Sequence, residues 1–487
     1  MVTQHRERED KYAVADDFVL PGLNDLAGDG GRVEEVQHVL TNVYHDTAGG
    51  DLWSARVTLR RRTGGGEDGW QLKLPAGAAR TEVASAARSH TVPKALAEVV
   101  LGLTRGQPLV PVAELRTERA VTRLVGADER LLAEVADDRV SSMTLGEESR
   151  LDHWREVEVE LGDDSADEAL LTAVGRRLLD AGAQRAASPS KLARALGLAP
   201  VEQLETPAAV TVADLVTRYV REQCEEILRG DLALRLGEPR VHKTRVAIRR
   251  LRSTLRVYGD LLDAEPAQRL DTELTWLASL LGEVRDREVL LARFQAQLAE
   301  LPAELVLGPV AADLDTVLST ERRRHLEELT PELKSRRQLE LLEALTRWRT
   351  EPPFLETAGA AADQVRSYVR ASRQKMRKRL RQAQQASGPA QEVLLHRARK
   401  AAKRARYAAE LAVPAWSKAA QHVERAQDLQ TLLGEHQDSV VAAAFLRRMG
   451  AEAGTRAGRN GFTYGLLLAR ELERAARIRR DLPGQKV

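Results

Sequence analysis

A repeated stretch of sequence constrains the fold of this chain more than any other feature. Residues 241–255, VHKTRVAIRRLRSTL, match residues 395–409, LHRARKAAKRARYAA, at an offset of 154 residues. A second pair follows in the same order, LLGEVRD at 280–286 and LLGEHQD at 432–438. Because order and spacing are both kept, duplication of a unit of about 140 residues explains them.

Each copy of the first stretch has the spacing of a helix with a cationic ridge beside an apolar stripe. Steps of three and four residues place the ridge within an arc of about 80°. In the first copy the ridge is His242, Arg245, Arg249, Arg252 and Arg256. In the second it is His396, Arg399, Lys403 and Arg406, and Glu410 replaces the last arginine. Like charges on one ridge repel, so the ridge favours a polyanion as its partner; the alternative is a solvated basic face.

The chain from about residue 210 onward has apolar residues at helical spacing throughout. Two duplicated units predict two helical bundles packed about a pseudo-twofold axis, which brings the two ridges together. We hypothesise that four acidic residues of the second repeated segment pair with ridge arginines and orient them: Glu283, Asp286, Glu435 and Asp438. The protonation of the ridge histidines stays open, because a charged or a neutral imidazole can donate to a phosphate oxygen.

The first 200 residues have a different pattern, with short alternating runs separated by Gly, Asp and Asn clusters. This pattern predicts antiparallel strands, with helices at about 92–103 and 164–183. The charge differs too: residues 1–200 carry 25 basic and 33 acidic residues, whereas 201–487 carry 49 and 39. The first part is therefore net acidic and the second net basic, which predicts different electrostatic roles.

The alternation in this first part gathers ionisable residues on one face of several strands. They are Glu7, Glu9 and Lys11, then Arg60 and Arg62, Lys73, Glu134 and Asp138, and Glu156, Glu158 and Glu160. A closed antiparallel barrel would point one such set inward. An interior with both carboxylates and cations suits an anionic phosphate chain together with Mg²⁺ or Mn²⁺. The alternative is that these are solvated outer faces.

Six short segments of this part resemble the CYTH superfamily, the triphosphate tunnel metalloenzymes, in that family's order. They are EREDK at 7–11, YHDT at 44–47, LRRR at 59–62, LKLP at 72–75, LRTER at 115–119 and WREVEVEL at 154–161. The resemblance implies an eight-stranded tunnel that binds triphosphate or polyphosphate and often hydrolyses the terminal anhydride with Mg²⁺ or Mn²⁺.

The resemblance also implies roles for individual residues. Metal-binding carboxylates would be Glu7, Glu9, Glu156, Glu158 and Glu160, of which Glu7 and Glu9 would act in catalysis together with Lys11. Phosphate clamps would be Lys11, Arg60, Arg62, Lys73 and Arg119, with Glu134 and Asp138 as further acidic positions of the substrate site. Which of the three late glutamates contacts the metal is left open.

The helical part resembles the CHAD domain, the conserved-histidine α-helical domain, through both ridge helices and both LLGE segments. The resemblance implies a binder of inorganic polyphosphate that is associated with polyphosphate granules and commonly fused to a CYTH domain. The anion site would be lined by His242, Arg245, Arg249, Arg252, Arg256, His396, Arg399, Lys403 and Arg406. Domain boundaries are predicted at 1–197 and 210–480, with a linker at 198–209; Ser188-Pro-Ser-Lys191 is expected to be a turn into a short closing helix.

We therefore expect a metal-dependent triphosphatase, acting on inorganic triphosphate or polyphosphate ends, fused to a polyphosphate-binding domain. A non-catalytic polyphosphate-binding protein and a class IV-type adenylate cyclase are the alternatives. The basic helices lack interleaved aromatic residues, so no specific nucleic-acid partner is expected. No apolar run approaches a membrane span, and Cys224 is the single cysteine, so neither a membrane partner nor a disulfide is expected. The expected location is the cytoplasm, and association with polyphosphate granules is a further expectation from the resemblance to the CHAD domain.

Overall fold

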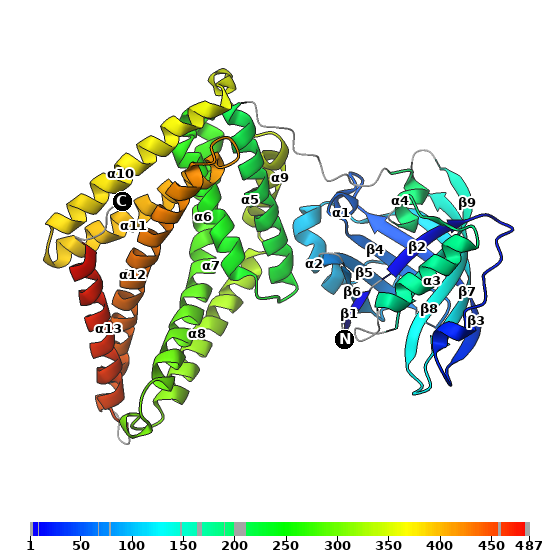
Figure 1. Ribbon diagram of the computed structural model, residues 1–487, viewed down its shortest axis with the longest axis horizontal. Helices are drawn as coiled ribbons and strands as arrows, with labels where there is room; N and C mark the ends of the chain where they lie inside the picture. The colour runs from blue at the N-terminus through cyan, green and yellow to red at the C-terminus, as the bar shows by residue number, and fades with distance from the viewer. Residues whose placement is uncertain are drawn as a thin grey trace. The chain divides into compact units, whose positions relative to one another are not determined.

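The structure is a computed structural model that describes residues 3–7, 9–66, 68–76, 79–146, 149–162, 168–188, 190–198, 211–455 and 459–482. It divides into two compact units, Met1–Glu205 and Thr206–Val487 (Figure 1). An antiparallel sheet dominates the first unit, and the second is helical, which confirms the predicted fold class. Most of the predicted linker at 198–209 lies outside the described residues.

The first unit consists of ten strands and four short α-helices in its described residues. The strands are β1 Thr3–Glu7, β2 Glu9–Val14, β3 Arg32–Asp46, β4 Thr58–Thr63, β5 Gly69–Ala76, β6 Ala79–Ser85, β7 Val110–Val125, β8 Leu131–Thr144, β9 Leu151–Leu161 and β10 Gln184–Arg185. The helices are α1 Asp51–Ser54, α2 Lys94–Thr104, α3 Glu168–Asp180 and α4 Lys191–Leu196. Helices α2 and α3 form where the sequence predicts them.

The strands form one sheet in the order β1-β6-β5-β4-β3-β7-β8-β9-β2-β10. The expected count of eight strands is therefore wrong for the described residues, and the hydrogen-bonded ladder has two ends rather than closing on itself. The reason is that β1 and β2 are separate strands with only Arg8 between them in the sequence. β1 pairs with β6 and β2 with β9, so the covalent chain links the two sides of the sheet.

Strand β9 has apolar side chains on its outer face and glutamates on its inner face. In β9, Val157 and Val159 are fully buried under Val174 and Leu178 of α3, on the outer face (Figure 1). The glutamates that alternate with these valines therefore point to the inner face. Solvated outer faces are thus excluded for the glutamates of this strand.

The second unit contains nine α-helices in its described residues. They are α5 Val212–Arg235, α6 Val241–Val257, α7 Ala264–Ala299, α8 Val310–Glu332, α9 Arg336–Thr350, α10 Val365–Gln385, α11 Gly388–Ala412, α12 Ala419–Thr455 and α13 Phe462–Asp481. The order α5–α6–α7–α8 is repeated as α10–α11–α12–α13, and α9 is extra. No helix in the described part of the chain is long and apolar enough to cross a membrane.

Three apolar cores hold the helical unit together. The first joins α5, α6 and α9 with the N-terminal half of α7, and the second joins α10, α11 and the N-terminal half of α12. In the third, the C-terminal halves of α7 and α12 meet α8 and α13, and Phe294 stacks on Phe445 at 5.6 Å between ring centroids. The two long helices thus tie the duplicated bundles to each other.

The ridge helices α6 and α11 lie against each other, as the duplication predicts. Tyr258, at the end of α6, donates a hydrogen bond to the carbonyl oxygen of Ala408 in α11 at 3.2 Å. Arg250 in α6 donates to the carboxylate of Glu410 in α11 at 3.0 Å. These contacts bring the two cationic ridges next to each other.

Candidate functional site

The pairing of β2, β8 and β9 places charged side chains on one inner surface. In the β2–β9 ladder Glu9 lies opposite Glu160, and Lys11 lies opposite Glu158. In the β8–β9 ladder Glu134 lies opposite Glu160. Directly opposed residues share a face of the sheet, so Glu160 has a carboxylate beside it on each neighbouring strand.

This surface is part of a cavity of about 310 Å³ inside the sheet. Each of the eight strands β2 to β9 contributes at least one lining residue, and Lys191 of α4 adds another, so the sheet wraps around the cavity. The predicted site residues that line it are Glu9, Lys11, Arg60, Arg62, Lys73, Arg119, Glu134, Glu158 and Glu160. The side chain of Glu7 lies outside the described residues.

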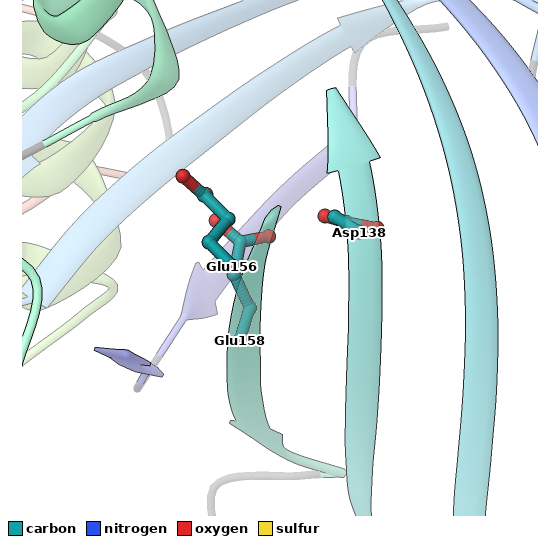
Figure 2. Close-up of side chains that lie close together, drawn as sticks. All are labelled: Asp138, Glu156 and Glu158. Atoms are coloured by element: carbon teal, nitrogen blue, oxygen red, sulfur yellow. The ribbon is translucent and has the colours of Figure 1, made fainter. Parts of the chain in front are cut away.

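Three buried carboxylates gather at one side of the cavity. Asp138 of β8 and Glu156 and Glu158 of β9 each offer an oxygen within 4.8 Å of the others, and Figure 2 shows the three side chains close together. Asp138 and Glu156 are 0% and 6% exposed and do not line the cavity. Glu158 is therefore the member of this carboxylate trio that a ligand in the cavity can reach.

Lys191 neutralises the carboxylate trio. Its Nζ lies 3.0 Å from Asp138, 2.7 Å from Glu156 and 2.7 Å from Glu158. Burial alone would lower the pKa of this amine, but the three carboxylates outweigh burial and raise it. Lys191 is therefore charged at neutral pH.

Arg119 and Lys11 complete the neutralisation. Arg119 donates to both oxygens of Asp138, at 2.8 and 2.7 Å, and to Glu158 at 2.9 Å. Lys11 donates to Glu158 and lies 3.1 Å from Glu9. Burial would raise the pKa of Glu158, but the charges of Lys11, Lys191 and Arg119 hold it well below its ordinary value. Glu158 is thus ionised, and the trio is surrounded by three cations.

A basic wall is formed by residues of β4 and β5. The Nε of Arg60 donates to Gln71 at 2.8 Å, and its Nη1 donates to the hydroxyl of Tyr44 at 3.2 Å. The Nε of Arg62 donates to Asn42 at 3.3 Å. Both arginines line the cavity. Lys73, 3.5 Å from Glu82 of β6, extends the wall.

The donor set in the cavity fits a divalent cation that prefers oxygen ligands. The carboxylate trio has the necessary spacing, but an ion bound there would compete with Lys191 for all three groups. The opposed pair Glu9 and Glu160, with Glu134 next to it, offers a second set of oxygens that lines the cavity. Cations lie next to this set as well, with Lys11 3.1 Å from Glu9 and Arg123 2.7 Å from Glu134. We regard it as the better candidate for metal binding because all three of its members line the cavity.

A second cationic cluster lies in the helical unit, between α6 and α11. Its members are two pairs of equivalent residues, Arg245 with Arg399 and Arg249 with Lys403. Arg249 lies close enough to lower the pKa of both Arg399 and Lys403. Burial and the charges of Arg399 and Arg249 lower the pKa of Lys403 to about 7. We call these four residues the basin.

Two equivalent aspartates hold the arginines of the basin. Arg245 lies 3.5 Å from Asp286, and Arg399 lies 3.7 Å from Asp438. The predicted pairing is thus confirmed for both aspartates. It is wrong for the glutamates as ridge partners: the contacts seen are from Glu283 to Arg287 and from Glu435 to Arg293 and Arg474.

The glycine of each LLGE segment lies next to the basin arginine of the same copy. A Cβ on Gly282 would lie 2.7 Å from Nη1 of Arg245, whereas a Cβ on Gly434 would lie 3.6 Å from Nη2 of Arg399. The first distance is a clash and the second an ordinary contact. The two copies therefore place equivalent residues in the basin, but Arg245 is packed more tightly against its glycine than Arg399 is.

The outer ends of the ridges contact carboxylates. Arg252 and Arg256 donate to Asp271 at 2.8 and 2.6 Å. Arg406 donates to Glu410 at 2.8 Å, and this glutamate also accepts from Arg250. The predicted anion-site residues are therefore divided: the four basin cations cluster between the helices, whereas these three arginines form ion pairs.

The two ridge histidines are both exposed, beside the basin. His396 lies 3.2 Å from the side-chain oxygen of Gln437. Burial and the charges of Arg285, Arg249 and Arg245 lower the pKa of His242. At neutral pH His242 is therefore uncharged in the free protein.

Sequence reasoning missed the role of Lys191. The segment predicted a turn and a short helix, which is correct: Ser190 caps α4 by accepting from the backbone amide of Ala193 at 3.1 Å. Nothing in the spacing shows that the first residue of this helix reaches the carboxylates of β8 and β9. A lysine directly after a capping serine was the only available signal.

A charged cavity inside an antiparallel sheet, followed by a duplicated helical unit, defines a CYTH–CHAD protein. Residues 5–196 match the CYTH domain and residues 218–447 match the CHAD domain. Two uncharacterized proteins of Mycobacterium tuberculosis, MT2285 of strain CDC 1551 and Rv2226 of strain H37Rv, are 37% identical to this chain over 501 residues. The alignments cover 98% of this chain and 95% of each relative. The chain therefore belongs to the CYTH–CHAD fusion proteins.

Solved structures with similarity to this chain include PptA from Streptomyces chartreusis, at 21% identity and a TM-score of 0.47, covering 57% of this chain and 99% of that one. HpAC1 from Hippeastrum, an adenylyl cyclase candidate with a dominant triphosphatase activity, aligns at 19% identity and a TM-score of 0.23. That alignment covers 40% of this chain and 99% of HpAC1. CYTH domains are typically metal-dependent enzymes that act on phosphoanhydrides, as triphosphatases or cyclases.

Proposed function

We propose that the cavity of the sheet hydrolyses the terminal phosphoanhydride of inorganic triphosphate or of polyphosphate ends, with Mg²⁺ or Mn²⁺. One observation carries the proposal: a basic wall and a group of carboxylates line the same cavity. Phosphate oxygens need the first and a divalent cation needs the second. An apolar ligand would have no use for either set of charged groups.

In this proposal Arg60, Arg62 and Lys73 hold the phosphate chain along the basic wall, and Glu9 and Glu160 hold the cation. When bound, the cation polarises a phosphoryl oxygen and lowers the pKa of a water molecule. Lys11 donates to the phosphates rather than accepting a proton, because Glu158 and Glu9 outweigh burial and raise its pKa. Neutralisation of the developing negative charge supplies most of the rate enhancement.

The basin of the helical unit is proposed to bind inorganic polyphosphate. Three donors there are buried and make no hydrogen bond within the described residues: Nη1 of Arg245, Nε of Arg249 and Nε of Arg399. A phosphate chain bound beside these guanidinium groups would form charge-assisted hydrogen bonds, which are stronger than neutral ones. Association with polyphosphate granules in the cytoplasm is part of the same proposal.

The catalytic half is tested by measuring phosphate release from triphosphate, long-chain polyphosphate and ATP, with and without Mg²⁺ or Mn²⁺. We expect metal-dependent release from the inorganic substrates and its reduction by at least about 100-fold in Glu9→Gln and Glu160→Gln. Glu118→Gln is the matched control, because this glutamate is exposed and pairs with Arg116 outside the cavity. Full activity of Glu9→Gln would refute the site; polyphosphate binding without release would indicate a binding protein, and cyclic AMP formation a cyclase.

The binding half is tested in the Glu9→Gln protein, so that the ligand is not degraded. The double substitution Arg249→Glu and Lys403→Glu should abolish tight binding of long-chain polyphosphate. Arg336→Glu is the control, because that side chain is 92% exposed and pairs only within its own helix among the described contacts. Undiminished affinity of the double variant would refute the basin as the binding site.

A further inference from the structure

In the first copy of the helical repeat, α9 covers the seam between α5 and α7. Gln338 of α9 donates to Asp231 of α5 at 2.8 Å. Arg337 of α9 donates to Glu273 of α7 at 2.5 Å, and its guanidinium stacks over Trp276. The apolar residues of α9 belong to the core of this bundle. The seam is thus closed by a helix that the chain itself supplies.

The equivalent seam in the second copy lies between α10 and α12. Tyr-Val-Arg at 219–221 of α5 corresponds to Tyr-Val-Arg at 368–370 of α10, an offset of 149. The structure supports this alignment: Tyr219 donates to Glu410 of α11, and Tyr368 packs on Tyr258 at the end of α6. The LLGE segments align α7 with α12 at an offset of 152.

Arginines replace the residues that face α9 in the first copy. At these offsets buried Cys224 corresponds to Arg373, the partly buried Leu228 corresponds to Arg377, and Glu273 corresponds to Arg425. Arg373 reaches His422 of α12 at 3.2 Å, and Arg377 and Arg425 are exposed. Burial and the charges of Arg377 and Arg425 lower the pKa of Arg373, which shows that the cations crowd one another.

The whole of α10 carries uncompensated charge. Its 21 residues include eight Lys or Arg and no Asp or Glu. We find no carboxylate ion-paired with any of the eight among the described residues, although arginines elsewhere in this unit are commonly paired. Four of them, Arg370, Arg373, Arg377 and Arg381, recur at helical spacing within an arc of about 80°, so the stripe runs along one face. These four residues with His422 and Arg425 form what we call the α10–α12 seam.

The chemistry of the seam decides which occupant fits. A protein helix in the position of α9 needs apolar anchors, and the two anchor positions on α10 are arginines. A single-stranded nucleic acid needs an open aromatic face, but the ring of Trp416 is contacted by His422 at 5.2 Å and by the guanidinium of Arg366 at 5.8 Å. A flexible polyanion that has no nucleobases needs neither apolar anchors nor an aromatic face. It requires only the row of cations.

We propose that the α10–α12 seam is a second binding surface for long inorganic polyphosphate chains, in addition to the basin. This proposal rests on the proposed polyphosphate-binding function of the helical unit. A chain long enough to engage both surfaces gains affinity from the second contact by effective concentration, whereas a short chain engages one surface only. The seam therefore makes affinity depend on chain length.

The test uses the full chain in the Glu9→Gln background and compares three variants with it. The seam variant is R373S/R377S/R425S, and its matched control is R269S/R336S/R480S, which removes the same charge from exposed, ion-paired arginines. The third variant is R373K/R377K/R425K, which keeps the charge. The probes are short-chain polyphosphate, long-chain polyphosphate and a single-stranded DNA oligonucleotide.

We expect the seam variant to bind long chains at least about tenfold more weakly, with a salt dependence about 2 units shallower in log–log slope, and to bind short chains normally. The lysine variant should bind like the parent because it keeps the charge, and the normal short-chain binding of the seam variant shows that this variant is folded. Unchanged long-chain affinity in the seam variant, or loss of DNA binding alone, overturns the proposal. If the basin variant R249E/K403E also binds both chain lengths normally, the proposed function itself fails.

Discussion

Binding of polyphosphate to the basin should weaken as the pH rises from 6 to 8, and Lys403 is the group responsible. Burial and the charges of Arg399, Arg249 and Arg245 lower the pKa of its amine to about 7, although Asp438 opposes them. At pH 7 about half of the free molecules therefore carry an uncharged amine. A bound phosphate chain adds negative charge beside the amine and returns its pKa toward the ordinary lysine value of about 10.4.

The size of the effect follows from these two pKa values. In the complex the proton stays on Lys403 between pH 6 and 8, whereas in the free protein most of it is lost over this range. Linkage then gives about tenfold tighter binding at pH 6 than at pH 8, or about 1.4 kcal/mol, with uptake of about half a proton at pH 7. A bound chain favours the charged form of His242 in the same way, but the Lys403→Arg variant described below keeps that contribution, so the comparison of the two proteins isolates Lys403.

The assay is titration of the Glu9→Gln protein with long-chain polyphosphate at pH 6, 7 and 8 and constant ionic strength. Lys403→Arg is the decisive comparison, because arginine stays charged and should bind tightly at all three pH values. Terminal phosphates also titrate near pH 6, but both proteins share that contribution. The reasoning is refuted if the parent shows no pH dependence, or if the arginine variant keeps the tenfold change.

Three further outcomes are expected. Lys191→Ala should lower the free energy of unfolding by about 3–5 kcal/mol at pH 7 in thermal melts, because it removes from the buried Glu156 the cation that lies 2.7 Å away. Gly434→Ala should be neutral or stabilise by up to about 1 kcal/mol, whereas Gly282→Ala should displace Arg245 and weaken polyphosphate binding in the same titration. Asp271→Asn should strengthen binding up to about fivefold, since it releases two ridge arginines from a partly buried carboxylate; equal or weaker binding would contradict this.

The inner surface of the sheet could be predicted because strand alternation has a fixed period. Once β9 is a strand, Glu158 and Glu160 must share a face, and apolar Val157 and Val159 decide which face is packed against a helix. The strand count could not be predicted. A single residue separates β1 from β2, and nothing in the sequence shows that the two segments pair with different strands.

The contacts of Lys191 with the carboxylates of β8 and β9 could not be predicted either. They depend on where α4 packs on the sheet rather than on local sequence spacing. The same limit applies to the division of the ridges. Periodicity places Arg249 and Arg252 on one face of α6, but it does not show that Arg249 meets α11 while Arg252 meets Asp271 of α7. Contacts between elements distant in sequence decide which cations remain available to a ligand.

The duplication explains why one part of the helical unit is symmetric and another is not. The basin lies between the two ridge helices and takes one arginine, one further cation and one aspartate from each copy, so both copies need the same residues. The seam between α5 and α7 and the α10–α12 seam have no such requirement, because each contacts different surroundings. In the first copy the seam packs against α9 and carries Cys224 and Leu228; in the second, Arg373 and Arg377 stand at these positions. Polyphosphate binding at the basin should therefore depend on both copies, whereas the dependence on chain length should come from the second copy alone.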